Sequence, residues 1–105
     1  GGTARPLLRL SMFQPVQRDF AFVVDTSVEA EKLVRAAKGA DKALISDVAV
    51  FDVYQGQGIE SGRKSLAIAV TIQPTAKPLT EPEIDAIGAK IVAAVAKATG
   101  GTLRS

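Results

Sequence analysis

The sequence contains neither cysteine nor histidine. Without cysteine the chain forms no disulfide and has no thiol nucleophile, and without either residue it lacks the usual zinc ligands and any imidazole base. It also has no apolar run of about 18 residues, the length from which a membrane-spanning helix is recognised. Ordinary zinc sites and mechanisms based on a thiol or an imidazole are therefore excluded, and no membrane partner is expected.

The net charge of the chain is also small. The 105 residues include 13 Lys and Arg and 11 Asp and Glu, which gives a net charge of +2 at neutral pH. A balance this small permits an acidic partner but does not by itself indicate nucleic acid. Hydrophobic residues make up 47% of the chain, as in a globular domain, and the length fits one domain, expected in the cytoplasm.

Hydrophobic periodicity and the residues that cap helices divide the chain into strands and helices. Alternating apolar residues predict strands over residues 16–25, 44–55 and 63–73, with a short final strand after residue 101. Helical spacing predicts helices over residues 26–39 and 80–99. Each helix begins with the spacing of a capping box, Thr26 with Glu29 and Thr80 with Glu83. Residues 1–15 form a lead-in, and residues 16–105 form the domain.

The order strand, helix, strand, strand, helix, strand is typical of an α+β fold, the ferredoxin-like plait. It predicts a four-stranded antiparallel sheet with two helices on one face and the other face open. The Gly56-x-Gly58 segment lies between two strands rather than before a helix, so it indicates a hairpin turn and not a phosphate-binding loop.

Strand alternation assigns one set of bulky residues to the face beneath the helices. This set comprises Phe20, Phe22 and Val24, then Ala49, Phe51 and Val53, then Leu66, Ile68, Val70 and Ile72. With Ile84, Ile87 and Ile91 of the second helix, Phe20, Phe22, Phe51, Leu66 and Ile68 are expected to form one core. Replacing Phe51 with Ala is then expected to cost about 3–5 kcal/mol.

The opposite face is predicted to carry mostly small side chains around the single tyrosine. Its members are Asp19, Ala21, Val23, Asp52, Tyr54, Ser65, Ala67, Ala69 and Thr71. A flat surface of small residues with one aromatic ring suits the stacking of a planar ligand such as a base. An ordinary solvated sheet face is the alternative. The carboxylates Asp19 and Asp52 have no nucleophile or metal cluster beside them, so catalysis is not expected.

Five segments in this order resemble one known family over nearly the whole chain, from about residue 14 to 105. They are Arg18-Asp19-Phe20-Ala21, Phe51-Asp52-Val53-Tyr54-Gln55-Gly56, Gly62-Arg63-Lys64-Ser65-Leu66-Ala67, Leu79-Thr80-x-x-Glu83-Ile84 and Gly101-Thr102-Leu103-Arg104. Together they resemble the ferredoxin-fold anticodon-binding domain, which forms the C-terminus of the β subunit of bacterial phenylalanine–tRNA ligase.

The resemblance implies that the domain holds the anticodon loop of phenylalanine tRNA, with the first anticodon base on the sheet. The family's motif positions correspond here to Ala21, Asp52, Tyr54 and Ser65. All four lie on the face predicted above to be open. Candidate phosphate contacts are Arg18, Arg63 and Lys64, although the last two could equally form a solvated charge pair.

The resemblance also implies a parent enzyme, an α2β2 heterotetramer that joins phenylalanine to tRNA with ATP and Mg²⁺. Its chemistry belongs to the α subunit, so this domain is expected to be non-catalytic and to need no cofactor of its own.

Three other classes share the predicted fold. A regulatory plait domain that binds a small molecule is the main alternative. An acylphosphatase-like hydrolase would use an asparagine, which this chain lacks. An RNA-recognition motif is disfavoured because the predicted central strands lack its paired aromatic residues.

Overall fold

The computed structural model describes residues 14–104 and confirms the predicted element order. Its elements are β1 (Val16–Asp25), α2 (Ala30–Gly39), β2 (Ile45–Tyr54), β3 (Arg63–Ile72), α3 (Glu81–Thr99) and β4 (Thr102–Leu103). The strand and helix ends lie within a few residues of those expected from the sequence. The predicted lead-in lies outside the described residues except for Gln14 and Pro15, which belong to no helix or strand.

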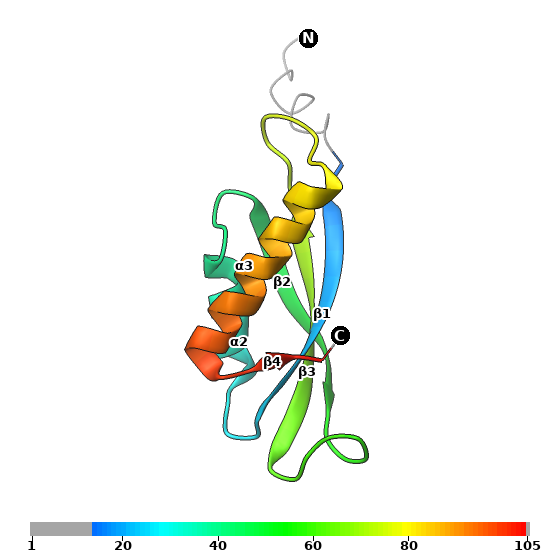
Figure 1. Ribbon diagram of the computed structural model, residues 1–105, viewed down its shortest axis with the longest axis vertical. Coiled ribbons are helices and arrows are strands. Elements are labelled where there is room, and N and C mark those ends of the chain that lie inside the picture. Colours follow the sequence, from blue (N-terminus) through cyan, green and yellow to red (C-terminus); the bar gives the residue numbers. More distant parts are fainter. Residues whose placement is uncertain (1–13, 105) are drawn as a thin grey trace, which may run out of the picture.

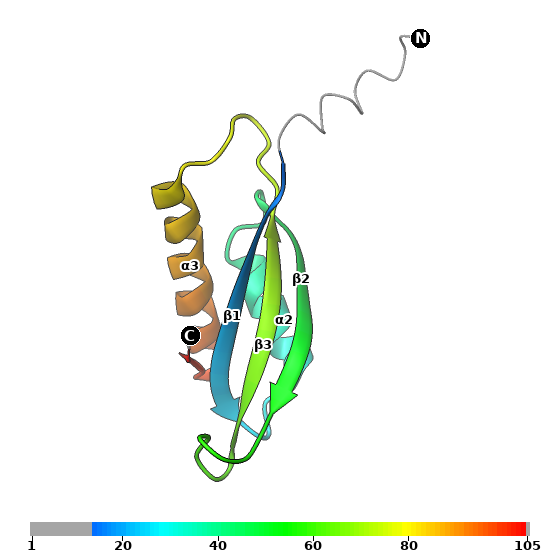
Figure 2. The same cartoon turned by 90° about the vertical axis from the view of Figure 1, so that its right-hand side faces the viewer.

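The four strands form one antiparallel sheet in the order β2-β3-β1-β4. Figure 1 shows α2 and α3 on the same side of this sheet, and Figure 2 looks onto the strands with no helix between them and the viewer. β1 and β3 pair along their full ten residues, whereas β4 pairs with only two residues of β1. The molecule is therefore the predicted ferredoxin-like plait, with one sheet face covered by helices and one face open.

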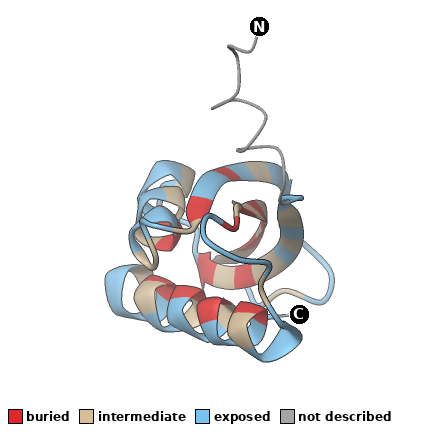
Figure 3. Cartoon of the chain, turned by 90° about the horizontal axis from the view of Figure 1, so that it is seen from above, coloured by how far each residue is buried: buried red, intermediate tan, exposed pale blue. Residues whose placement is uncertain are grey.

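The core lies between the helices and the covered face of the sheet, and Figure 3 shows buried positions on both the helices and the strands. It contains, among others, Phe22, Leu66, Ile68, Ile84, Ile87 and Ile91, all predicted to be there. Phe20 is half-buried and packs against this cluster, with its ring 6.1 Å from that of Phe22. The apolar residues of β1 and β3 thus occupy the face that alternation predicts.

The prediction for β2 is wrong for its apolar residues, because the strand contains a bulge. Val50 pairs with Ile68 and Asp52 pairs with Ala67, so Phe51 is an extra residue without a partner in the register. Phe51 is 59% exposed instead of buried, and Ala49 and Val53 are exposed as well.

Val48 and Val50 fill the positions under the helices that Ala49 and Phe51 were expected to occupy, whereas Val53 lies on the predicted side, opposite Leu66, but is exposed. The cost predicted for replacing Phe51 does not apply either, since a substitution at an exposed site usually changes stability by no more than about 0.5 kcal/mol.

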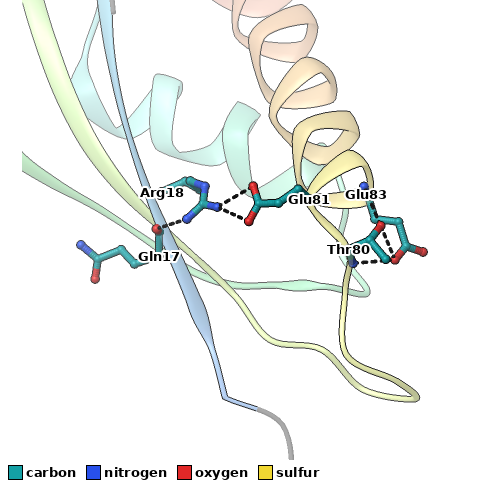
Figure 4. Close-up of polar contacts among 5 residues, drawn as sticks. All are labelled: Gln17, Arg18, Thr80, Glu81 and Glu83. Atoms are coloured by element: carbon teal, nitrogen blue, oxygen red, sulfur yellow. Dashed lines mark hydrogen bonds and ion pairs between the residues drawn. The ribbon is translucent and has the colours of Figure 1, made fainter.

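The two helix starts differ from each other. In α3 the predicted capping box is present: the Thr80 hydroxyl accepts from the Glu83 amide at 3.3 Å, and the Glu83 carboxylate accepts from the Thr80 amide at 2.8 Å (Figure 4). In α2 the predicted box is wrong, because the helix begins later, after Glu29, with no side-chain cap. The Thr26 amide instead donates to the Gly62 carbonyl at 3.1 Å and belongs to the turn after β1.

No helix in the described part of the chain is long and apolar enough to cross a membrane.

Candidate functional site

The open face carries the four predicted site residues in two neighbouring rows across the central strands. In the first row, Ala21 of β1 pairs with Ala67 of β3, which pairs with Asp52 of β2. In the second row, Val23 pairs with Ser65, which pairs with Tyr54. Directly paired residues on one face stand about 5 Å apart, so Ala21, Asp52, Tyr54 and Ser65 share one small area of sheet.

The bulge in β2 is what brings Asp52 and Tyr54 to this face. Val50 packs toward the core, and unbroken alternation would turn Asp52 and Tyr54 to the helix side as well. The extra residue reverses the alternation, so that Asp52 pairs with Ala67 and Tyr54 with Ser65 on the open side.

Tyr54 is held in place by the turn that follows it. Its hydroxyl donates to the Gln57 carbonyl at 2.7 Å, and its ring lies against Gly56. The side chain nevertheless remains 39% exposed. The ring is therefore a fixed aromatic surface that a planar group can reach.

Arg104 lies over this ring, with its guanidinium carbon 5.9 Å from the ring centroid. The Arg104 amide donates to the Ala21 carbonyl, which anchors the residue beside β1 at the edge of the sheet opposite β2. Its side chain must therefore extend across the open face above β1 and β3 to reach Tyr54. The sequence analysis quoted Arg104 within a family motif but did not assign it to the site. Its place at the site could have been found from the short last strand. When this strand pairs with β1, residue 104 lies in the same row as Ala21.

Asp52 and Ser65 supply the polar groups of the site. Asp52 is exposed, and among residues 14–104 its carboxylate has no hydrogen-bond or ion-pair partner. Ser65 is only 4% exposed, between Val23 and Tyr54, yet its hydroxyl also lacks a partner within this part of the chain. An ionised carboxylate accepts hydrogen bonds only, while a hydroxyl both donates and accepts, so the pair can meet either kind of group.

Two of the three predicted phosphate contacts, Arg18 and Lys64, lie on the helix side of the sheet, whereas Arg63 lies on the open face beyond Ser65, one pair further along β3 toward the hairpin. Arg18 pairs with Glu81 of α3 at 3.3 Å, and its neighbour in the register, Val70, is buried on the helix side (Figure 4). Arg63 lies at the hairpin end, 3.6 Å from Asp25 and 3.9 Å from Glu60.

Lys64 is half-buried opposite the core residue Val24, so it too lies outside the two rows. Arg104 lies over the Tyr54 ring on the open face, whereas Arg63, on the same face, is already paired with two carboxylates.

Two shallow hollows lie away from the rows. One, of about 340 Å³, runs between β1 and α3 and is lined by residues that include Phe20, Asp85 and Gly88. The other, of about 400 Å³, is formed by the turn between β2 and β3. In the part of the chain that the structure describes, no three Cys, His, Asp or Glu side chains group so as to hold a metal ion.

The structure thus combines a plait with an uncovered sheet face, an accessible ring and unpaired polar groups beside the ring. Comparison with known families gives the class of the domain. The family model of the ferredoxin-fold anticodon binding domain matches residues 11–104, and the chain belongs to this family. Family membership favours RNA over the small-molecule ligand of the alternative regulatory domain.

Among curated relatives, the chain is 65% identical over 101 residues to the phenylalanine–tRNA ligase β subunit of Paramagnetospirillum magneticum. It is 64% identical over 102 residues to that of Bradyrhizobium diazoefficiens and 61% identical over 101 residues to that of Rhodospirillum rubrum. These alignments cover 96–97% of this chain but only 13% of each relative.

Proposed function

We propose that this domain binds the anticodon of phenylalanine tRNA on the open face of its sheet, with Ala21, Asp52, Tyr54 and Ser65 as the contact residues. The observation that carries the proposal is the meeting of these four residues in two adjacent rows of one uncovered face. They come from three strands, and each offers a property that the recognition of a base requires.

Tyr54 provides the surface for stacking. Its hydroxyl bond to Gln57 fixes the ring, and its exposed area leaves room for a base. Stacking of a base on an aromatic ring contributes about 1–3 kcal/mol and accepts any base, so Tyr54 supplies affinity and not identity.

Asp52 selects the identity of the base. The phenylalanine anticodon begins with guanine, whose Watson–Crick edge presents the N1–H and N2–H donors. The unpaired Asp52 carboxylate can accept both, and the Ser65 hydroxyl adds one adaptable hydrogen bond. Ala21, in the same row as Asp52, is small enough to leave space for the base.

The phosphates of the loop require cations near this face. Arg104, beside Tyr54, is the best placed of them. Arg18, Arg63 and Lys64 are further candidates. The carboxylates that already face Arg18 and Arg63 reduce what those two side chains contribute.

The relatives' names support a place for this domain in a phenylalanine–tRNA ligase β subunit. In that setting its partners are the rest of the β subunit and the α subunit of an α2β2 enzyme in the cytoplasm. ATP and Mg²⁺ serve the joining reaction elsewhere in the enzyme, and the domain itself is a non-catalytic module spanning residues 16–105 after a lead-in of residues 1–15.

The test is the discrimination between guanine and adenine at the first anticodon position by the full ligase carrying Asp52→Ala. We expect kcat/KM for aminoacylation to fall for the guanine tRNA and to change little for the adenine variant, so that their ratio shrinks about 5- to 150-fold, as for one lost recognition of a base edge.

Asp47→Ala is the matched control, because Asp47 is an exposed aspartate on the same strand that pairs with Thr71 on the same face. It should leave the ratio unchanged. An equal loss for both tRNAs with Asp52→Ala would make Asp52 a structural residue and overturn its assigned role.

A further inference from the structure

Phe51 is an aromatic residue that the fold exposes without using it in the core. Its side chain is 59% exposed, and it is absent from the buried cluster and from the residues packed against it. Most large apolar side chains of this small domain are buried, and an exposed phenylalanine gains little of the stabilisation that burial provides. Its exposed position therefore indicates a role other than stabilising the fold.

The bulge that exposes Phe51 also sets its direction. Val50 packs toward the helices, so by alternation Phe51 points to the opposite side of the sheet. After the extra residue, Asp52 also lies on the open side, followed by Tyr54. One strand thus presents a ring, a carboxylate and a second ring on its open side.

The spacing of the two rings suits neighbouring nucleotides. Phe51 and Tyr54 are three residues apart, which is roughly 10 Å of strand before the bulge shortens it. Proteins that read single-stranded RNA on a sheet stack two or three bases on exposed aromatic residues. The carboxylate of Asp52 between the rings has no partner within residues 14–104 and remains available to a base edge.

We propose that Phe51 is a second stacking surface, which holds the nucleotide adjacent to the one on Tyr54. This inference rests on the proposed function, since it assigns a further contact in the same RNA site. The occupant is an unstacked base, because Phe51 continues the open face formed by Asp52 and Tyr54 and is 59% exposed there. Stacking is sequence-tolerant, so Phe51 adds affinity without selecting a base.

The test measures the dissociation constant of phenylalanine tRNA for the full ligase carrying Phe51→Ala, Phe51→Leu or Phe51→Tyr. Loss of one stacked base should raise the dissociation constant ~5- to 150-fold in Phe51→Ala. Phe51→Leu should be nearly as weak because it keeps an apolar side chain without a ring, and Phe51→Tyr should restore binding. The guanine-to-adenine ratio at the first anticodon position should be unchanged in all three variants.

Val53→Ala is the matched control, an apolar residue of the same strand that is 55% exposed but paired with the core residue Leu66 on the helix side. It should bind tRNA normally. Unchanged tRNA binding in Phe51→Ala together with weakened binding in Tyr54→Ala would overturn this inference and leave the proposed function standing.

If neither Phe51→Ala nor Tyr54→Ala alters binding, the proposed function fails as well. Normal binding in Phe51→Leu, or a loss of enzyme assembly in Phe51→Ala, would show instead that Phe51 packs against another protein segment.

Discussion

Tyr54 and Arg104 meet although they lie at opposite edges of the sheet. The contact is possible because the strands between them carry small side chains on the open face, Ala21 on β1 and Ala67 on β3. Larger residues in that row would block the path of the arginine side chain. The small residues therefore serve two purposes: they leave space for a base, and they let a cation from one edge reach the ring at the other.

Removal of the Arg104 side chain should weaken RNA binding by a modest factor. An exposed cation–π contact contributes about 0.5–1 kcal/mol, and Arg104 also offers a positive charge near the loop phosphates. We expect Arg104→Ala to raise the dissociation constant of tRNA for the full ligase about 2- to 10-fold, with partial recovery in Arg104→Lys, which keeps the charge.

Arg35→Ala is a suitable control for this measurement, since Arg35 is an exposed arginine on α2 paired with Glu31. It should leave binding unchanged. Tighter binding in Arg104→Ala would contradict the prediction and would mean that the guanidinium competes with the base for the ring.

At the start of α3, one carboxylate makes the contacts that stabilise the first turn of the helix. Glu83 accepts from the Thr80 amide at 2.8 Å and pairs with Lys77 at 3.0 Å. The hydrogen bond from the Thr80 backbone and the bond from Lys77 lower the pKa of Glu83 below the ordinary glutamate value. The ionised form is therefore favoured in the folded state, and the helix start depends on that charge.

The lowered pKa predicts a pH dependence of stability. A group whose pKa is lower in the folded state stabilises the protein above its unfolded pKa, and the contribution disappears as the pH falls through the folded value. We expect Glu83→Gln to lower the free energy of unfolding at neutral pH and to converge with the wild type in acid, as measured by denaturant unfolding over the acidic range. Glu31→Gln, in the first turn of α2, serves as the control. Parallel curves for Glu83→Gln and the wild type would disprove this coupling.

The bulge of β2 illustrates why the sequence predicted the open face correctly and the core of the same strand wrongly. Before Asp52 the strand offers two alternating sets, Val48 with Val50 and Ala49 with Phe51, and both are apolar, so composition does not tell which set is buried. The set with Phe51 was assigned to the core, which is wrong, while Asp52 and Tyr54 were placed on the face where the structure has them. An extra residue changes the parity in mid-strand and leaves no mark in the sequence.

Elements and topology were predictable throughout because they depend on local signals: alternation, capping and glycine-rich turns. The core of β1, β3 and α3 followed from the same periodicity. The start of α2 was not predictable in this way, since the Thr26 amide donates to the distant Gly62 carbonyl and the helix begins only after Glu29. Arg104 was missed for a related reason, because its contact with Tyr54 joins residues 50 positions apart in the sequence.

The whole domain, with a net charge of +2, should bind RNA weakly on its own. Each phosphate contact with a single strand contributes about −0.7 to the slope of log affinity against log salt, so about three contacts give a slope near −2. We expect the 105-residue chain to bind an anticodon stem-loop weakly and with no steeper a slope, measured by fluorescence titration between low and physiological salt. Nanomolar binding that ignores salt would contradict this expectation.

The extra residue in β2 also leaves the strand free in length as well as in side chain at one position. Phe51 is exposed, so many side chains could stand there without disturbing the fold. Deleting that one position would place Asp52 directly after Val50, so simple alternation without a bulge would keep Asp52 and Tyr54 on the open face, opposite Ala67 and Ser65. This strand thus tolerates both a substitution and a gap at that place, whereas regular pairing through Phe51 in the strand as it stands would exchange the binding surface with the interior.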